Sequence, residues 1–275
     1  RAAHGEQAYQ YSWFCALYHE WARPLGAVLR QKHKAGDKAF IDWSGDGVDI
    51  ADRETGEVWQ APVFVACLGA SGYAFVKAAP SRESAHWLRL HDETFAYFGG
   101  MTAAVVPDNE RTGVTSPCRY DPDLNPTYAA WAQHNSVAVI PARPYRPRDK
   151  AKVENAVLLA QRWILARLRN HTFFSVAQAN EEIARLLEEY NARPLQKLGV
   201  SRRELWETVD RPALRPLPSR RFEPFDWATR TVNIDYHVPV AEHYYSVPHT
   251  LIGQKVEARW TGSTVEFLHR GRRVA

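Results

Sequence analysis

The order of apolar segments between residues 38 and 190 constrains the fold of this chain more than any other feature. Strand-like stretches come first, with turn residues between them, at 38–43, 48–51, 58–68 and 73–79. Short connections between successive strands predict antiparallel pairing. After Pro80 the pattern changes to alternating helices and strands, which predicts a parallel extension of the sheet with helices on its faces. The expected fold class is therefore α/β, with a mixed sheet flanked by helices.

Flanking residues mark where the helices are expected to start and stop. Ser81 is a candidate N-cap for a helix that ends before Gly99, and Asp149 is a candidate N-cap for a long helix over 149–170. Pro24 interrupts an N-terminal helical pattern over 6–30, so two short helices are an equal alternative there. Further helices are expected over 125–135 and 175–190, and further strands over 102–107 and 137–140.

The end of the chain indicates a second, smaller domain. Pro and Arg gather between residues 211 and 224, as they do in linkers. Short strands separated by Gly or Pro follow at 231–234, 243–247, 255–260 and 263–269, which predicts a small all-β, barrel-like domain. The predicted division is an N-terminal helical segment (1–36), an α/β domain (37–192), a Pro/Arg-rich linker (193–222) and a small β-barrel domain (223–275).

Composition excludes several classes of protein. The chain has 275 residues, of which 45% are hydrophobic, and its mean hydropathy is -0.44. It contains no apolar run near the roughly 18 residues that mark a membrane span. Its first ten residues are polar, unlike a signal peptide, and its three cysteines are too few for a disulfide framework. We therefore expect a reduced, cytoplasmic protein with no membrane partner, and the missing initiator Met favours a fragment of a longer chain.

Positive charge is concentrated in one part of the chain. Lys and Arg number 35 against 31 Asp and Glu, so the formal net charge is only +4. Residues 141–170 contain eight basic residues and only two acidic ones, so this stretch alone has a formal charge of +6. A solvated helix face is the usual origin of such a cluster. Here, however, the first five basic residues fall in a Pro-rich loop and the turn after it, which is a less common place for residues that only keep a protein soluble. These five are Arg143, Arg146, Arg148, Lys150 and Lys152.

Three carboxylates from distant parts of the chain are expected to converge. Asp42 follows three apolar residues of the first predicted strand, and Asp108 follows the strand that ends at Pro107. Functional groups gather at the carboxyl ends of strands in open α/β sheets. Glu154 lies in the second turn of the long helix predicted after the fifth strand. The three side chains meet if the first and fourth strands are neighbours and that helix packs over them.

Clustered carboxylates repel one another unless a cation lies among them, and hard oxygen ligands favour Mg²⁺ or Mn²⁺. Two such ions, about 3.5–4 Å apart, activate an attacking oxygen and stabilise the leaving oxygen of a phosphoryl transfer. The basic residues nearby would then hold the phosphate backbone of the substrate. The expected cofactor is two Mg²⁺ (or Mn²⁺) ions per site, with Asp42, Asp108 and Glu154 as metal ligands and catalytic residues.

Each member of the trio also has an ordinary structural interpretation. Asp42 is the hardest to explain that way, because a carboxylate with apolar neighbours in a strand must find a partner. Asp108 could belong to a simple turn after the strand, and Glu154 could pair with Lys150 at i,i+4 on a helix surface. The trio gains its weight from the shared topology rather than from any single member.

Three blocks of sequence carry a resemblance to a known family. The blocks are Lys-Ala-Phe-Ile-Asp-Trp-Ser-Gly (38–45), Pro-Asp-Asn followed by Thr-Gly-Val (107–109 and 112–114), and Asp-Lys-Ala-Lys-Val-Glu-Asn (149–155). They resemble the catalytic blocks of IstA-type transposases, the bacterial insertion-sequence group twenty-one within the DDE transposase and retroviral integrase superfamily. The similarity covers nearly the whole chain, and the last block is the most specific. Glu110 departs from the pattern, in which a small or apolar residue is expected.

The resemblance implies an RNase H-like fold for the α/β domain, a metal-binding triad of Asp42, Asp108 and Glu154, and a small barrel after the catalytic domain. It also implies a DNA transposase that cleaves transposon 3′ ends and transfers the 3′-hydroxyl into target DNA. Such an enzyme is expected to act as a homo-oligomer on paired ends, with a separate ATPase helper resembling IstB. In a bacterium it would be cytoplasmic and associated with the nucleoid when bound to DNA. The family's end-recognising helix-turn-helix region would precede Arg1.

Two other functions remain open at this point. One is a catalytically inactive DNA-binding or assembly module that kept the fold of a transposase. The other is an RNase H-like nuclease without strand transfer. An intact trio of carboxylates favours the enzyme over the inactive module, because drift would readily lose one of the three.

The basic cluster yields a testable prediction. Replacing two of its members, Arg146→Gln with Arg148→Gln, should weaken binding to DNA duplexes of every sequence, because phosphate contacts carry no sequence information. The log–log slope of affinity against salt concentration should flatten by about 0.9 for each phosphate that the variant no longer binds. Titrations of a labelled duplex at several salt concentrations measure this slope. An unchanged slope would mean that these residues only solvate the surface.

Overall fold

The computed structural model describes residues 10–22, 33–107, 114–116, 123–141 and 147–275. By its contacts the chain separates into two units, residues 1–32 and 33–275. The described part of the first unit contains helix α1 (Tyr11–Ala22), which covers the middle of the helix expected over 6–30. None of the helices in the described ranges is both long enough and apolar enough to cross a membrane.

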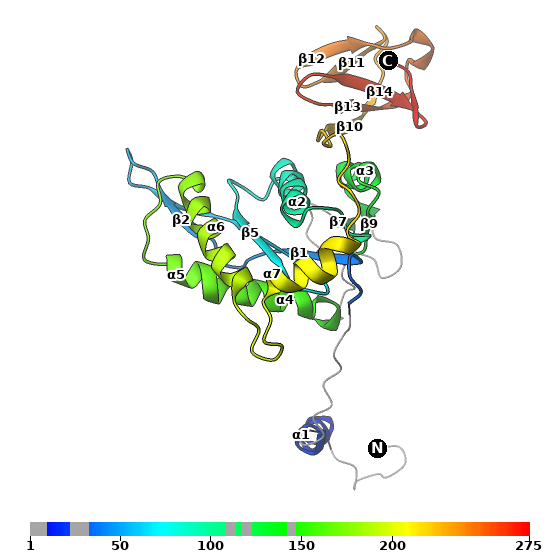
Figure 1. Ribbon diagram of the computed structural model, residues 1–275. Coiled ribbons are helices and arrows are strands. Elements are labelled where there is room, and N and C mark those ends of the chain that lie inside the picture. Colours follow the sequence, from blue (N-terminus) through cyan, green and yellow to red (C-terminus); the bar gives the residue numbers. More distant parts are fainter. Residues whose placement is uncertain (1–9, 23–32, 108–113, 117–122, 142–146) are drawn as a thin grey trace, which may run out of the picture. The chain divides into compact units, whose positions relative to one another are not determined.

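Within the described residues, the second unit is built on a five-stranded mixed sheet (Figure 1). In spatial order, the strands are β5 (Ala74–Ala78), β4 (Val63–Leu68), β1 (Lys38–Trp43), β6 (Ala104–Pro107) and β9 (Ala138–Val139). β1 pairs antiparallel with β4, and β4 pairs antiparallel with β5. On the other edge of β1, β6 and then β9 run parallel. This order and these directions are those of an RNase H-like fold, and they confirm the predicted mixed sheet.

The stretch 58–68, expected as one strand, is two strands. Pro62 has no N–H for a ladder hydrogen bond, and the chain divides there into β3 (Val58–Ala61) and β4. β3 pairs with β2 (Val48–Ala51) in a separate antiparallel hairpin, so the antiparallel neighbour of β1 is β4 rather than the next strand along the chain. A second short pair outside the main sheet joins β7 (Val114–Ser116) to β8 (Asp123–Leu124).

Helices cover both faces of the main sheet (Figure 1). One face carries α2 (Ser84–Phe98) and α3 (Pro126–His134). The other carries α4 (Pro147–Ala160), the π-helical turn η2 (Gln161–Leu165), α5 (Ala166–Leu168) and α6 (Val176–Ala192). Side chains of β1 alternate between the two cores, because Ala39 and Ile41 pack with α2 and α3 whereas Phe40 packs with α4 and α6.

Two helices start at positions other than those expected. α2 begins at Ser84 after Glu83, so Ser81 is not its N-cap, and the Ser81 hydroxyl lies 2.9 Å from His86 Nδ1 instead. α4 begins at Pro147 and contains Asp149, which is therefore not its N-cap either. Pro suits a first helical position, because its φ is already helical and its missing N–H has no partner there. Gly99 ends α2 with φ 78°, as predicted.

The core under α2 and α3 is rich in aromatic rings. Trp87 and His91 of α2 and Tyr128 and Trp131 of α3 are buried together against Phe64 of β4. His91 Nδ1 lies 2.8 Å from the carbonyl oxygen of Trp87, and its Nε2 lies 3.1 Å from the hydroxyl of Tyr128. Burial lowers the pKa of His91 from 6.5 to about 4. The imidazole is therefore neutral at neutral pH and donates from Nδ1 to the carbonyl oxygen.

Part of the predicted linker 193–222 consists of packed helical turns. α7 (Arg202–Leu205) begins with a reciprocal cap between Ser201 and Glu204. It continues into the π-helical η3 (Trp206–Asp210) and the 3-10 turn η4 (Arg211–Ala213). Trp206 stacks on Tyr73 with ring centroids 4.7 Å apart. These turns belong to the packed body of the second unit rather than to a loose linker.

Asp210 fastens this segment to the sheet. The residue is 1% exposed, and its carboxylate accepts the backbone N–H groups of Gly36 at 3.1 Å and of Ser71 at 2.8 Å. Gly36 lies just before β1, and Ser71 lies in the turn between β4 and β5. A Cβ at Gly36 would lie 2.3 Å from the carbonyl oxygen of Ala213, and its φ is +66°, so only glycine fits this approach.

The last strands form two small antiparallel sheets around one apolar core. One sheet contains β10 (Asp226–Thr231), β13 (Lys255–Trp260), β14 (Val265–His269) and β15 (Arg272–Arg273). The other pairs β11 (His237–Val240) with β12 (His243–Ser246), which η5 (His249–Leu251) follows. Val238, Val256 and Phe267 are among the residues of the shared core. The prediction of an all-β end is confirmed, but the first strand ends at Thr231 instead of starting there.

Removing the Asp210 carboxylate tests how much it stabilises the fold. Asp210→Ala leaves two buried N–H donors without an acceptor, and each such group costs about 1–3 kcal/mol. We expect the free energy of unfolding in urea to fall by about 2–4 kcal/mol, and Asp210→Asn, which keeps one acceptor oxygen, to cost less. Asp226→Ala, an exposed control, should change little. Equal stabilities of the Asp210 and Asp226 variants would show that the carboxylate is dispensable.

The buried imidazole predicts a pH dependence of stability. The pKa of His91 is about 4 in the folded protein, below its unfolded value of 6.5, so the unfolded chain binds the proton more tightly. Stability from this group is complete above pH 6.5 and falls as the pH is lowered toward 4, by up to about 3 kcal/mol. Urea unfolding at about pH 7, 6 and 5 measures the fall. His91→Gln should flatten it, whereas the exposed His243→Gln should leave it intact.

Candidate active site

Asp42 lies one residue before the end of β1, between the buried side chains of Ile41 and Trp43. Asp42 is itself partly exposed. Its Oδ1 accepts the backbone N–H of Trp43 at 2.8 Å. Because side chains alternate along a strand, Asp42 shares with Phe40 the sheet face that α4 covers. A partly exposed carboxylate therefore lies at the end of the central strand, on the helix-covered face.

The parallel neighbour β6 ends in register with this part of β1. Phe40 pairs with Val106, and Ile41 pairs with Pro107. Val106 belongs to the same apolar cluster as Phe40, so both strands direct these two side chains to the α4 face. Asp108, the residue after Pro107, lies outside the described residues.

Helix α4 packs against both β1 and β4. Among the side chains of α4 that the structure describes, the buried ones are small, Ala156 and Ala160, and both join the cluster around Phe40. Small side chains let the helix axis approach the sheet closely. Glu154 lies in this helix and is exposed.

Gln161 shows which side of the helix faces the end of β1. Its Nε2 donates to Ser44 Oγ at 3.2 Å and to Asp46 Oδ2 at 3.1 Å, in the segment that directly follows β1. Glu154 precedes Gln161 by seven residues, which is about two helical turns, so the two side chains lie on the same side of the helix. The side of α4 that bears Glu154 thus runs along the chain that leaves β1.

Arg82 holds the same segment from outside α4. Its Nη2 donates to the carbonyl oxygen of Ser44 at 3.3 Å, and its Cζ lies 5.6 Å from the centre of the Trp43 ring. Ser44 is itself 1% exposed. The residues after Asp42 are therefore held by η2 through Gln161 and by the segment before α2 through Arg82.

Sequence reasoning missed both Gln161 and Arg82. The spacing of seven residues from Glu154 was a signal for Gln161, because it places the two on one helix side. No local pattern marked Arg82, since its contact with Ser44 joins residues 38 positions apart.

Of the five predicted phosphate-binding residues, some lie outside the residues that the structure describes and others lie in α4. Arg143 and Arg146 lie outside the described residues. Arg148, Lys150 and Lys152 lie in the first turns of α4, where the helix backbone is described and their side chains are not. Because α4 starts at Pro147, Arg148 is helical rather than part of the predicted loop, whereas Lys150 and Lys152 lie in the helix that was predicted over 149–170.

Among the residues that the structure describes, no three His, Cys, Asp or Glu side chains gather into a group that could hold a metal ion. That set does not include Asp108, and so the predicted trio stays a prediction.

Next to Gln161 lies a cavity of about 310 Å³. Asp46, Asp49 and His171 are among the side chains that line it.

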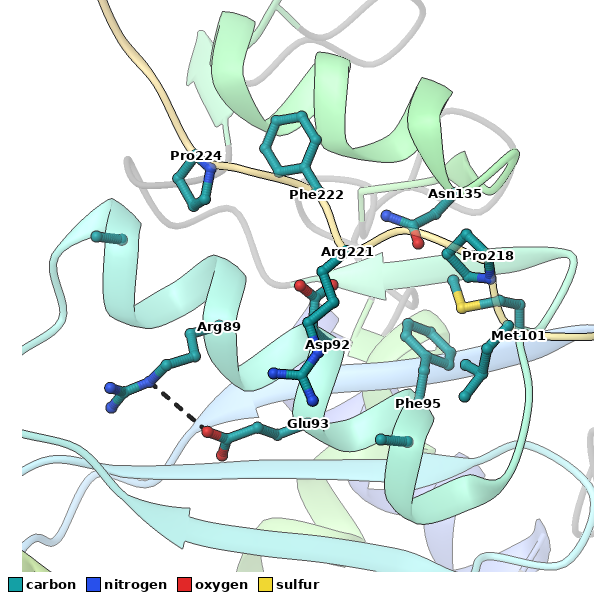
Figure 2. A pocket seen from close by; sticks show the side chains of 13 residues that line it. Arg89, Asp92, Glu93, Phe95, Met101, Asn135, Pro218, Arg221, Phe222 and Pro224 are labelled. Carbon is teal, nitrogen blue, oxygen red and sulfur yellow. Dashed lines mark ion pairs between the residues drawn. The ribbon is translucent and has the colours of Figure 1, made fainter. Parts of the chain in front are cut away.

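A larger cavity of about 460 Å³ lies elsewhere, between α2 and residues 217–224 (Figure 2). Asp92 lines it and accepts the indole N–H of Trp131 at 2.8 Å. Burial raises the pKa of the Asp92 carboxyl, while the hydrogen bond from Trp131 and the charge of Arg221 act in the opposite direction. In Figure 2 the Arg221 side chain extends toward Asp92 and Glu93. Since α2 covers the sheet face opposite α4, this cavity is separate from the end of β1 described above.

Comparison with known proteins gives consistent similarities. Residues 217–275 match the family described as "Mu transposase, C-terminal domain". Over 271 residues, the chain is 44% identical to the putative transposase for insertion sequence IS408 of Burkholderia multivorans, covering 98% of this chain and 52% of that protein. It is 27% identical to the transposase for insertion sequence element IS21 of Pseudomonas aeruginosa, over 86% of this chain and 59% of that protein.

The chain also aligns with a chain of a solved structure. An intasome of simian T-cell lymphotropic virus in complex with PP2A regulatory subunit B56 gamma aligns with a TM-score of 0.48 and 12% identity, over 90% of this chain and 82% of that chain. The chain spans about half the length of the curated relatives it matches. The expected resemblance is confirmed, and the chain is homologous to the transposases of bacterial insertion sequences, IS21 among them, along almost its entire length.

Proposed function

We propose that this chain is the catalytic part of a DNA transposase that cleaves transposon 3′ ends and transfers the freed 3′-hydroxyl into target DNA. The observation that carries the proposal is the parallel pairing of β1 with β6, which brings Ile41 opposite Pro107. The next residue of each strand segment is an aspartate, Asp42 in one and Asp108 in the other.

The side-chain alternation supports the same placement. Phe40 and Val106 are register partners, and both belong to the core under α4. Asp42 and Asp108 each come two residues later, and residues two apart point to the same face of a sheet. If the register of Phe40 with Val106 were continued by two residues, Asp42 and Asp108 would be partners with both carboxylates on the α4 face.

Glu154 supplies the third carboxylate. It lies on the side of α4 that also carries Gln161, and Gln161 contacts Ser44 and Asp46 just beyond Asp42. α4 packs on β1 and β4, and the proposal assigns its exposed Glu154 to the site at the ends of β1 and β6. Asp42, Asp108 and Glu154 are the residues we assign to catalysis.

This donor set fits Mg²⁺ or Mn²⁺. All three are carboxylates, the oxygen ligands that these hard cations prefer, and Asp42 is open enough to bind a ligand because it is only partly buried. We assign two ions to the site, held by Asp42, Asp108 and Glu154. When bound, the ions supply the positive charge that activates the attacking oxygen and stabilises the leaving one.

The other residues of the site position the carboxylates and the substrate. Gln161 and Arg82 fix Ser44 and thereby the chain that follows Asp42. Five cations are assigned to the phosphates of the DNA backbone. They are Arg143, Arg146, Arg148, Lys150 and Lys152. Neutralising backbone charge beside the scissile phosphate keeps the duplex in place while its strands are cut and joined.

The partners follow from the same proposal. They are the transposon ends, the target DNA, further copies of this chain on paired ends, and a separate ATPase helper resembling IstB. The compartment would be the bacterial cytoplasm, at the nucleoid when DNA is bound.

Incubating the protein with a labelled transposon-end duplex and Mn²⁺ tests the proposal. Strand-transfer products, longer than the substrate, are the expected result. Cleavage without transfer would instead indicate an RNase H-like nuclease. DNA binding without any reaction would indicate an inactive assembly module.

Glu154→Gln separates chemistry from folding. The substitution keeps size and helix propensity nearly constant, and Glu154 is exposed, so melting temperature and DNA affinity should stay near the parent values. Cleavage and strand transfer should fall by orders of magnitude, because the site loses an anionic oxygen ligand.

Glu181→Gln is the matched control, since Glu181 is an exposed glutamate of another helix, α6. It should leave the reaction rate unchanged. Near-normal strand transfer by Glu154→Gln would show that Glu154 is a surface residue and that the triad is wrong.

A further inference from the structure

A third cavity lies on the other side of α4 from Glu154. It has a volume of about 420 Å³ and is formed where the end of α4 and η2 meet the end of α6 and the turn after it. Leu159 and Trp163 line it. Each is two residues from Gln161, so both lie on nearly the opposite side of the helix from Gln161. Gln161 lines the separate cavity beside Asp46.

Three cations line this cavity, Arg193, Lys197 and Arg202, and no carboxylate of the described residues does. No ion pair with a described carboxylate is formed by any of the three. Nearby arginines behave differently, because Arg167 and Arg185 both pair with Glu189 at 2.7 and 2.6 Å. The cavity therefore concentrates positive charge that the described protein does not neutralise.

Aromatic rings hold two of the guanidinium groups in place. Arg193 Cζ lies 3.8 Å from the centre of the Trp163 ring, and Arg202 Cζ lies 4.1 Å from that of Tyr190. Arg202 Nη1 also donates to the carbonyl oxygen of Tyr190 at 3.4 Å. Stacking restricts the guanidinium planes, while the other N–H groups at their edges can still donate hydrogen bonds. Partial burial lowers the pKa of Arg202, since the cation has lost part of its water, and a bound anion would replace that solvation.

We infer that this cavity binds the phosphodiester backbone of a DNA segment, at phosphates other than those at the carboxylates. The inference rests on the proposed function, which supplies DNA as the ligand. Preoriented guanidinium edges match the oxygens of phosphate. The exposed apolar surface beside them, Trp163 at 39% and Leu198 at 62% exposed, suits the deoxyriboses that alternate with phosphates along a strand. α4 would then lie between two DNA contacts, one on each side.

The double variant Arg193→Gln with Lys197→Gln tests the inference in the full chain. Binding to a labelled duplex is measured over a series of salt concentrations. The log–log slope of affinity against salt concentration should become shallower by about 1.8, which is about 0.9 for each of the two phosphates that these cations would bind. The matched control is Arg167→Gln with Arg185→Gln, which changes the net charge equally but removes arginines that are already paired with Glu189. The control slope should stay at the parent value.

Other outcomes would overturn the inference. An unchanged slope, or an equal change in the control, would show that these cations do not contact phosphate. If instead the double variant alone lost self-association, measured by light scattering without DNA, the cavity would belong to an interface between copies. Should the double variant fail to fold, Lys197→Gln alone replaces it, because this side chain is exposed. The expected change is then a log–log slope that is shallower by about 0.9.

The strand-transfer assay keeps the two proposals apart. A slope that does not change in a protein that performs strand transfer rejects the second DNA contact and leaves the proposed function intact. A slope that falls as expected in a protein with no strand-transfer activity rejects the proposed chemistry and leaves the DNA contact intact.

Discussion

Strand β1 is hydrogen-bonded on both edges, to a strand of opposite direction on one side and to a strand of the same direction on the other. A strand in that position must be apolar toward both faces, and Phe40 and Ile41 satisfy the requirement on opposite sides. The charged residues of β1 lie toward its two ends, Lys38 at the start and Asp42 near the carboxyl end, and both are partly exposed. The carboxylate is thus at the end of β1 where its parallel neighbour β6 also ends.

Helix α4 carries the third residue of the proposed site. Its alanines allow close packing on the sheet, Gln161 directly after it binds the segment that follows β1, and its Glu154 stays exposed. The same helical run contributes Trp163 to a cationic cavity on its far side. One packed helix therefore connects the proposed catalytic carboxylates with the proposed second DNA contact.

Local patterns in the sequence were sufficient for β1, for β6 and for the helix that carries Glu154, because periodicity is encoded residue by residue. They failed where distant residues decide. Ser81 looks like an N-cap, but its hydroxyl interacts with His86 and the helix starts later. Asp210 lies in a stretch that resembles a linker, yet it is buried by contacts with residues 174 and 139 positions away. The Asp42–Asp108–Glu154 triad stays a prediction, since Asp108 lies outside the described residues.

Several contacts join the segment that leads to the C-terminal β-sheets to the main sheet and its neighbours. Asp210 accepts the N–H groups of Gly36 and Ser71. Arg215 pairs with Met101 through the backbone and donates from its guanidinium to the carbonyl oxygens of Thr102 and Ser136. Mechanical tension on the chain beyond Arg215 is therefore shared among contacts at the start of β1, in the β4–β5 turn, before β6 and before β9, and none of these named contacts is made by Asp42.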